Sequence, residues 1–321
     1  MALRSLRGQT HISRNGVLTG AAGALIAAFA ATVQGQDKTP ELSTSYYAEI
    51  GAGAEYDSNV TVDELDITSN ESDYGLTLDA SIGLKKPLTN STELSLSYDF
   101  SQTNYKEFSE VDRQTHLVGA DLSTELGEVD TGLSTFYIHS RLDGNKFLEL
   151  YRGSPYVSGF ISKRWFTRGA YVYSDKTIEN RPARDATTQA GELDFYYFRR
   201  GLRSYFNIGY RYRDENAEDD QFDYQSNSAK LRYVQRIELL DRTTKLELSW
   251  RFEDRDYSGV TPSIGEKRDE DRNRWRIDYE VPILEQGMVL FYYGYSDYDS
   301  NLPSADYTQS LLGARFTYRW E

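Results

Sequence analysis

The sequence predicts an all-β fold: a single transmembrane, antiparallel, up-and-down β-barrel of about 14 strands in an outer membrane. From about residue 44 onward, apolar residues recur at every second position, which is the period of a strand with two different faces. The alternating segments are about 12 residues long, beyond the usual 5–6 of soluble strands and sufficient for the 9–11 that a membrane strand needs. Short and long connections follow one another in turn, as in outer-membrane barrels.

Composition narrows the possible functions. The chain has 321 residues, no Cys, 3 His and 26 Tyr, with a net charge of −14. The lack of Cys excludes a disulfide scaffold and a Cys nucleophile, and the abundant aromatics argue against a disordered chain. The acidic balance argues against a nucleic-acid partner.

The N-terminus resembles a secretory signal peptide, residues 1–35. Arg4, Arg7 and Arg14 form a basic region, residues 21–31 form an apolar stretch, and small residues that suit cleavage follow. The alternative, an inner-membrane anchor, fits less well because 11 apolar residues are few for a membrane helix. We therefore expect a short N-terminal segment at 36–43 and the barrel domain at 44–321.

The strands are expected in the segments where the alternation is sustained. One example is Leu76, Leu78, Ala80 and Ile82, each separated by a small or polar residue. The pattern is least regular over residues 129–176. The expected strands are 44–57, 74–86, 92–105, 113–125, 129–141, 148–162, 165–176, 188–199, 203–214, 227–239, 242–256, 271–284, 287–299 and 307–320.

The connections define two ends of the barrel. Longer polar loops are expected at 58–73, 106–112, 142–147, 177–187, 215–226, 257–270 and 300–306. An even strand number places both termini with the short turns, which would be the periplasmic side. Aromatic residues near the strand ends are expected to form interfacial girdles. They are Tyr56, Tyr105, Tyr151, Trp165, Tyr173, Tyr212, Tyr257, Trp275, Tyr298, Tyr307 and Trp320.

The last strand carries Leu312, Ala314, Phe316, Tyr318 and Trp320 on one face. Its aromatic end resembles the terminal signal by which the barrel-assembly machinery recognises outer-membrane barrels. The resemblance implies that Phe316, Tyr318 and Trp320 form that signal.

Two further segments resemble the barrel of the surface lipoprotein assembly modifier family. They are residues 55–60 (EYDSNV) and residues 298–303 (YDSNLP), the latter followed by Asp306 and Tyr307. The resemblance covers nearly the whole mature chain and implies a transport-related role in bringing lipoproteins to the cell surface. It implies contact with outer-membrane lipid and lipopolysaccharide, and a lipoprotein cargo. Short Tyr-Asp-Ser-Asn loops also occur in barrels associated with exopolysaccharide export, so that role stays open.

The polar positions of the strands are expected to line the lumen. In the second half they are rich in Arg and Lys with interleaved acids, whereas the first half offers Asp79, Glu93, Asp99 and Asp121. Such charges could select solutes in a porin-like passive channel, or simply pair across neighbouring strands. The candidate lumen residues are Arg211, Arg213, Arg232, Arg251, Arg276, Asp278 and Glu280.

Support for catalysis is thin. Only His116 and His139 follow the leader, and a turn at Gly127 and Glu128 would place them opposite each other. They could begin a metal site, one could act as a base beside Ser140, or they could simply pack. The acidic loops lack the spacing of a calcium loop, and no phosphate loop or G-x-S-x-G motif is present. We therefore expect no enzyme activity, no metal site and no cofactor.

Overall fold

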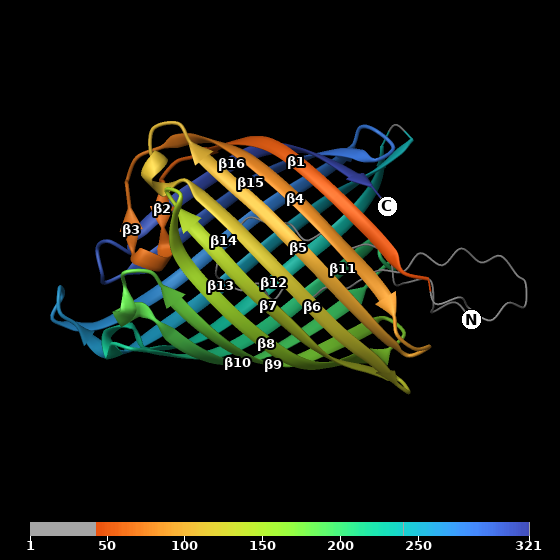
Figure 1. Ribbon diagram of the computed structural model, residues 1–321, viewed down its shortest axis with the longest axis horizontal. Helices are drawn as coiled ribbons and strands as arrows, with labels where there is room; N and C mark the ends of the chain where they lie inside the picture. The colour runs from red at the N-terminus through yellow and green to blue at the C-terminus, as the bar shows by residue number, and fades with distance from the viewer. Residues whose placement is uncertain (1–42, 240, 321) are drawn as a thin grey trace, which may run out of the picture.

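The computed structural model describes residues 43–239 and 241–320 of the chain, and the expected leader and most of the short segment after it lie outside this part. Within the described part, fourteen strands form a closed antiparallel barrel in which each strand pairs with the next and β16 closes against β1 (Figure 1). The expected fold class and strand number are therefore confirmed. The barrel strands are β1 (Ser45–Asp57), β4 (Asp73–Pro87), β5 (Thr92–Tyr105), β6 (Arg113–Leu126), β7 (Val129–Leu142), β8 (Asn145–Ser162), β9 (Trp165–Ile178), β10 (Ala186–Phe198), β11 (Ser204–Ala217), β12 (Tyr224–Leu239), β13 (Arg242–Thr261), β14 (Glu266–Pro282), β15 (Gly287–Ser300) and β16 (Tyr307–Trp320).

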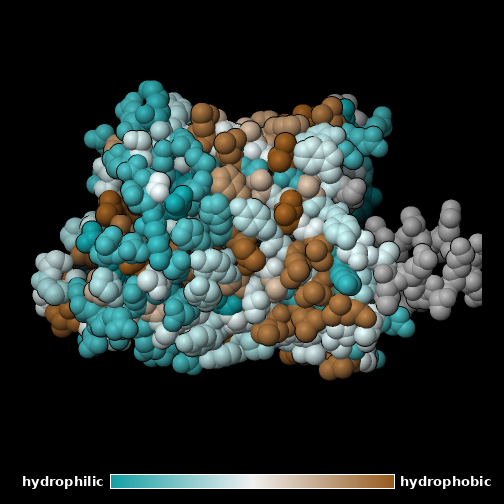
Figure 2. Space-filling model, viewed as in Figure 1, coloured by the Kyte–Doolittle hydropathy of each residue, from teal (hydrophilic) through white to brown (hydrophobic). Residues whose placement is uncertain are grey.

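Each strand separates an apolar outer face from a polar inner face. On β4, Leu76 is 67% exposed on the outside, whereas its neighbour Thr77 is buried inside. Side chains alternate in this way because successive Cβ atoms point to opposite sides of a sheet. Figure 2 shows hydrophobic side chains gathered toward the short-turn end and a mostly hydrophilic surface at the long-loop end.

Several strands extend beyond their expected ends on the long-loop side. The loop expected at 257–270 shrinks to residues 262–265, because β13 and β14 continue pairing to Thr261 and Glu266. Their outward residues at this end include the register partners Asp256 and Asp269. Carboxylates do not belong in hydrocarbon, so these strand ends project beyond the lipid-facing band.

The loop expected at 142–147 is wrong. Asp143 and Gly144 alone connect β7 to β8, with φ angles of 49° and 70°. Positive φ at both central residues is the type I′ hairpin geometry that Asp-Gly favours. The strands of this irregular region nevertheless pair in chain order.

The first strand begins and the last strand ends at the short-turn end. Ser45 pairs with Lys85 beside the β4–β5 turn, and Trp320 pairs with Ala48. In residues 43–239 and 241–320, no helix combines the length and apolar character that crossing a membrane requires.

The expected aromatic girdles are correct only in part. Tyr151, Tyr173, Trp165, Trp275 and Trp320 lie exposed on the outer face. Tyr257, Tyr298 and Tyr307 are instead buried, and Tyr105 donates a hydrogen bond to Asp57, because their strand parity turns them inward. Proximity to a strand end does not by itself decide which face a side chain occupies.

Candidate functional site in the barrel lumen

The segment between β1 and β4 folds into the lumen at the long-loop end; we call residues 58–72 the plug segment. It contains a small antiparallel pair, β2 (Thr61–Val62) and β3 (Ile67–Thr68), joined by the 3-10 turn η2 (Asp63–Leu65). Figure 1 shows this orange hairpin within the long-loop end of the barrel. Sequence analysis predicted only an acidic loop here, because two-residue strands leave no periodic signal.

Three carboxylates hold the plug segment to well-separated parts of the wall. Glu64 accepts two hydrogen bonds from Arg113 on β6, at 3.0 and 2.8 Å. Asp66 lies 2.6 Å from Arg184 in η4 (Pro182–Arg184) and 2.7 Å from Arg268 on β14. Asp63 accepts hydrogen bonds from tyrosines on β15 and β16, namely Tyr298, at 3.2 Å, and Tyr307. The segment therefore spans the lumen.

An apolar contact supports the same segment. Val62 is buried against Ile138, Phe147, Leu148 and Ile178 of the wall, and Leu65 packs beside it. These inward apolar side chains on β7, β8 and β9 interrupt the polar pattern of the inner face beside the plug segment. Their burial with the plug segment explains the exception, since the plug segment removes them from water.

Asp66 is ionised under all ordinary conditions. Burial alone would raise its pKa, but the hydrogen bond and charge of Arg268, together with the charge of Arg184, lower the pKa to about 2. The two guanidinium groups therefore act on a full negative charge. These two contacts are charge-assisted links between the plug segment and the wall.

The first family-like segment, residues 55–60, lies beside the start of β16, where the barrel closes. The Asn59 side-chain amide donates to the Thr308 carbonyl at 3.1 Å, and the Gln309 amide donates to Asp57 at 2.9 Å. The backbone N–H of Ser58 also donates to the Ser310 carbonyl. Residues about 250 positions apart thus form the seam from which the plug segment departs.

The predicted lumen residues all face inward, on β11 to β14; we call the inward side chains of these four strands the arginine wall. Six of the seven candidates contact a neighbouring polar side chain: Arg211 lies 3.4 Å from Glu192, Arg213 2.5 Å from the Tyr224 hydroxyl, Arg232 2.9 Å from Glu247, Arg276 2.7 Å from Asp278, and Glu280 2.9 Å from Lys245. Arg251 lies in register between Lys230 and Arg274.

Charges in the arginine wall pair along and between neighbouring strands. Glu253 is buried and lies 3.0 Å from Arg255, 3.5 Å from Arg274 and 3.8 Å from Arg213. Across the seam, Arg315 lies 3.0 Å from Asp79. This is the arrangement that the pairing interpretation expects, and it lines the inner face of these strands with ion pairs.

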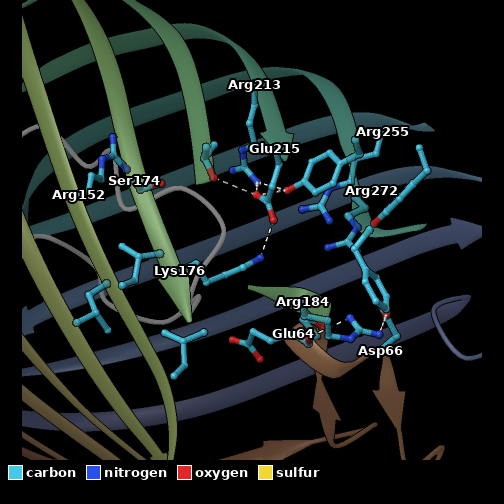
Figure 3. Close-up of a pocket in the computed structure, with 18 of the residues that line it drawn as sticks. Glu64, Asp66, Arg152, Ser174, Lys176, Arg184, Arg213, Glu215, Arg255 and Arg272 are labelled. Atoms are coloured by element: carbon cyan, nitrogen blue, oxygen red, sulfur yellow. Dashed lines mark hydrogen bonds and ion pairs between the residues drawn. The ribbon is translucent and has the colours of Figure 1, made fainter. Parts of the chain in front are cut away.

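A pocket of about 150 Å³ remains beneath the plug segment (Figure 3). Eight of its lining side chains are Arg or Lys and four are Asp or Glu, so its wall carries excess positive charge. Arg211 and Arg213 are among them, and Arg184 and Asp66 lie at its plug side. Sequence analysis did not find the contributions of Arg152 and Lys176, because β8 and β9 lie in the region of irregular parity.

The histidine pair lies outside this site. His116 and His139 are register partners, as expected, with ring centroids 6.1 Å apart. The suggestion of a base beside Ser140 is wrong, because Ser140 is fully buried on the inner face while its neighbour His139 points outward. His116 is hydrogen-bonded to the Tyr98 hydroxyl through Nδ1 at 2.8 Å, and its ring packs against that of Phe100 at 5.4 Å.

The expected assembly signal forms an exposed outer stripe on β16. Phe316 and Trp320 are exposed, and Tyr318 lies between them with its hydroxyl 2.7 Å from the Gln286 side chain. The stripe ends at the short-turn end beside Ala48 of β1.

Comparison with known proteins agrees with this geometry. Residues 41–285 match the family described as surface lipoprotein assembly modifier. The chain belongs to this family. The matched region includes β1 to β14, and therefore the plug segment and the arginine wall. No curated protein matches the sequence.

Solved structures share the fold. Outer-membrane expressed OmpT of Vibrio cholerae is 11% identical, with a TM-score of 0.51 over 86% of this chain and 97% of its own. The in-vitro folded trimer form of the same Vibrio cholerae outer membrane protein is 12% identical, with a TM-score of 0.50 over 87% and 99%. Fold and family together place the chain in the outer membrane as a barrel tied to surface lipoprotein assembly.

Proposed function

We propose that this barrel is an accessory in the assembly or translocation of surface lipoproteins, and that it acts with a closed lumen. The observation that carries the proposal is the family match over residues 41–285. The role is non-enzymatic, since it requires binding and passage of a lipoprotein and no bond to be made or broken.

The lumen supports this proposal over free diffusion of solutes. The plug segment is tied to β6, η4, β14, β15 and β16, and ion pairs fill much of the wall below it. A passive pore needs a continuous aqueous path. We therefore propose that the cargo is handled on the outer surface of the barrel or at the β1–β16 seam, and not through the lumen.

We propose an orientation of the barrel in the membrane from the difference between its two ends. The short-turn end, with the beginning of β1 and the end of β16, would face the periplasm, and the projecting acidic strand ends would face lipopolysaccharide. Phe316, Tyr318 and Trp320 would then be offered to the barrel-assembly machinery from the periplasmic side.

A second candidate is a passive channel for polar or charged solutes. The excess positive charge around the pocket favours it. Arg211, Arg213, Arg232, Arg251, Arg276, Asp278 and Glu280 would then form its selectivity wall.

The lead proposal is tested by deleting the gene in the native Gram-negative host and identifying lipoproteins released by protease from intact cells. We expect at least one lipoprotein to lose surface exposure while its total amount is unchanged, and the wild-type gene to restore exposure. The Arg203→Gln variant, altered at an exposed site, serves as a matched control and should restore it equally. An unchanged set of surface lipoproteins in the deletion strain would overturn the proposal.

A further inference from the structure

The pocket beneath the plug segment changes from apolar to basic along one strand. On β8, the inward residues Leu148 and Leu150 are followed by Arg152. On the adjacent β7, Ile138 is the register partner of Leu150, and Phe136 is the partner of Arg152. An apolar surface therefore directly adjoins a cationic one within a single pocket.

The cationic surface contains guanidinium groups with incomplete hydrogen bonding. Arg152 and Arg213 are only 9% and 7% exposed, and the buried Nε atoms of both, and of Arg211, have no hydrogen-bond partner within the described residues. Arg152 donates to Glu192 through one terminal nitrogen at 3.1 Å. Arg211 approaches the same carboxylate, with its Nε at 3.4 Å.

The nearby carboxylates do not balance these charges. Glu192 is shared between Arg152 and Arg211. Glu215 lies 2.6 Å from Lys176 but 3.9 Å from Arg213. A third carboxylate, Glu253, lies 3.8 Å from Arg213 but is shared with Arg255 and Arg274. The cations on this side of the pocket therefore outnumber the carboxylates that they share, and buried positive charge that is only partly balanced is costly. An anion placed there would relieve that cost.

We propose that the pocket binds a small organic anion, a carboxylate carrying a compact apolar group. The carboxylate would lie among Arg152, Arg211 and Arg213, since guanidinium groups match carboxylate geometry. The apolar group would lie against Phe136, Ile138 and Leu150. A cavity of about 150 Å³ fits this class, because an apolar cavity of about that volume in another protein holds benzene.

This site is independent of the proposed lipoprotein role, because it needs no cargo and lies within the barrel. It is tested on the full mature barrel, refolded in detergent micelles, by isothermal titration with benzoate. Three further probes separate the contributions: benzyl alcohol lacks the charge, while acetate and inorganic phosphate lack the apolar ring.

We expect saturable benzoate binding, with acetate, phosphate and benzyl alcohol each at least about tenfold weaker, since each loses one of the two interactions. Arg211→Gln should weaken benzoate binding at least about tenfold. Arg203→Gln, which removes an exposed arginine at the short-turn end, should leave it unchanged. Matching circular dichroism spectra of both variants would show that each is folded.

Three results would overturn the inference. They are no saturable benzoate binding to the wild-type barrel, benzyl alcohol binding as tightly as benzoate, and folded Arg211→Gln retaining wild-type affinity. Phosphate binding as tightly as benzoate would overturn the assignment of an organic anion. The wild-type probe series alone decides the matter if Arg211→Gln does not fold. None of these outcomes bears on the surface exposure of lipoproteins in cells.

Discussion

The two halves of the barrel wall make a polar lumen in different ways. The inward residues of β4 to β7 include Thr77, Ser81, Ser134 and Ser140, which are buried, short and neutral. The arginine wall on β11 to β14 instead carries long charged side chains that pair with one another. Short side chains leave space within a barrel, and long ones occupy it.

This difference explains where the plug segment can sit. It leaves β1 on the side of the short residues, packs its Val62 against the apolar residues of β7 to β9, and reaches Arg268 of β14. The strands β4 to β7, which we call the hydroxyl-bearing half, therefore leave space for the plug segment. The arginine wall supplies a positive charge that anchors it. The alternation of residues determines which side chains face the lumen. The length of those side chains determines whether an open aqueous path remains between them.

The largest difference in stability between the two halves is expected at Glu253, at the centre of the arginine wall. Glu253→Gln would leave Arg255, Arg274 and Arg213 without their shared buried carboxylate. Removing one partner of a buried ionic cluster costs about 3–5 kcal/mol. We expect the free energy of unfolding in urea, measured in lipid vesicles, to fall by that amount.

The matched control is Glu238→Gln, whose partner Arg203 lies 3.2 Å away with both side chains more than half exposed. An exposed pair contributes about 0–1 kcal/mol. A similar loss of stability for both variants would contradict the special role of the buried network.

The anchor of the plug segment gives a smaller, pH-dependent effect. The pKa of Asp66 is about 2 in the folded protein, below its ordinary value. The stabilisation is therefore complete above about pH 4 and is lost as the pH falls toward 2, an effect of about 2–3 kcal/mol. We expect Asp66→Asn to be less stable than wild type by that amount at pH 6 in urea titrations.

The difference between Asp66→Asn and wild type should shrink as the pH is lowered from 4 to 2. A difference that stays constant over this range would mean that the charge of Asp66 does not hold the plug segment.

The hydroxyl-bearing half should respond least. Ser140 is fully buried, and its hydroxyl lies 3.2 Å from that of Thr115. Ser140→Ala removes one neutral hydrogen bond, worth about 1 kcal/mol. A loss in urea unfolding as large as that of Glu253→Gln would remove the energetic distinction between the two halves.

Much of the barrel was predictable because strand periodicity is local. The alternation around Leu76 and around Trp275 is written in consecutive residues, so strand number, chain order and the inward position of Arg211 and Arg276 followed from it. Even the pairing of His116 with His139 could be counted from the turn between them.

The parts that were missed depend on contacts between distant residues. Asp66 meets Arg268 across about 200 positions, and Tyr307 turns inward to reach Asp63. Contacts between residues so far apart in the sequence leave no local pattern from which they could be predicted. The Asp143-Gly144 turn is the exception, since that dipeptide is a hairpin signal that the sequence did offer.

The most direct test of the closed lumen is single-channel conductance in planar bilayers. The wild-type barrel is compared with a variant carrying Glu64→Gln and Asp66→Asn, which weakens the contacts to Arg113, Arg184 and Arg268. We predict that the wild type inserts without steady openings and that the variant opens. Large, steady wild-type openings that the two substitutions leave unchanged would contradict a lumen closed by the plug segment.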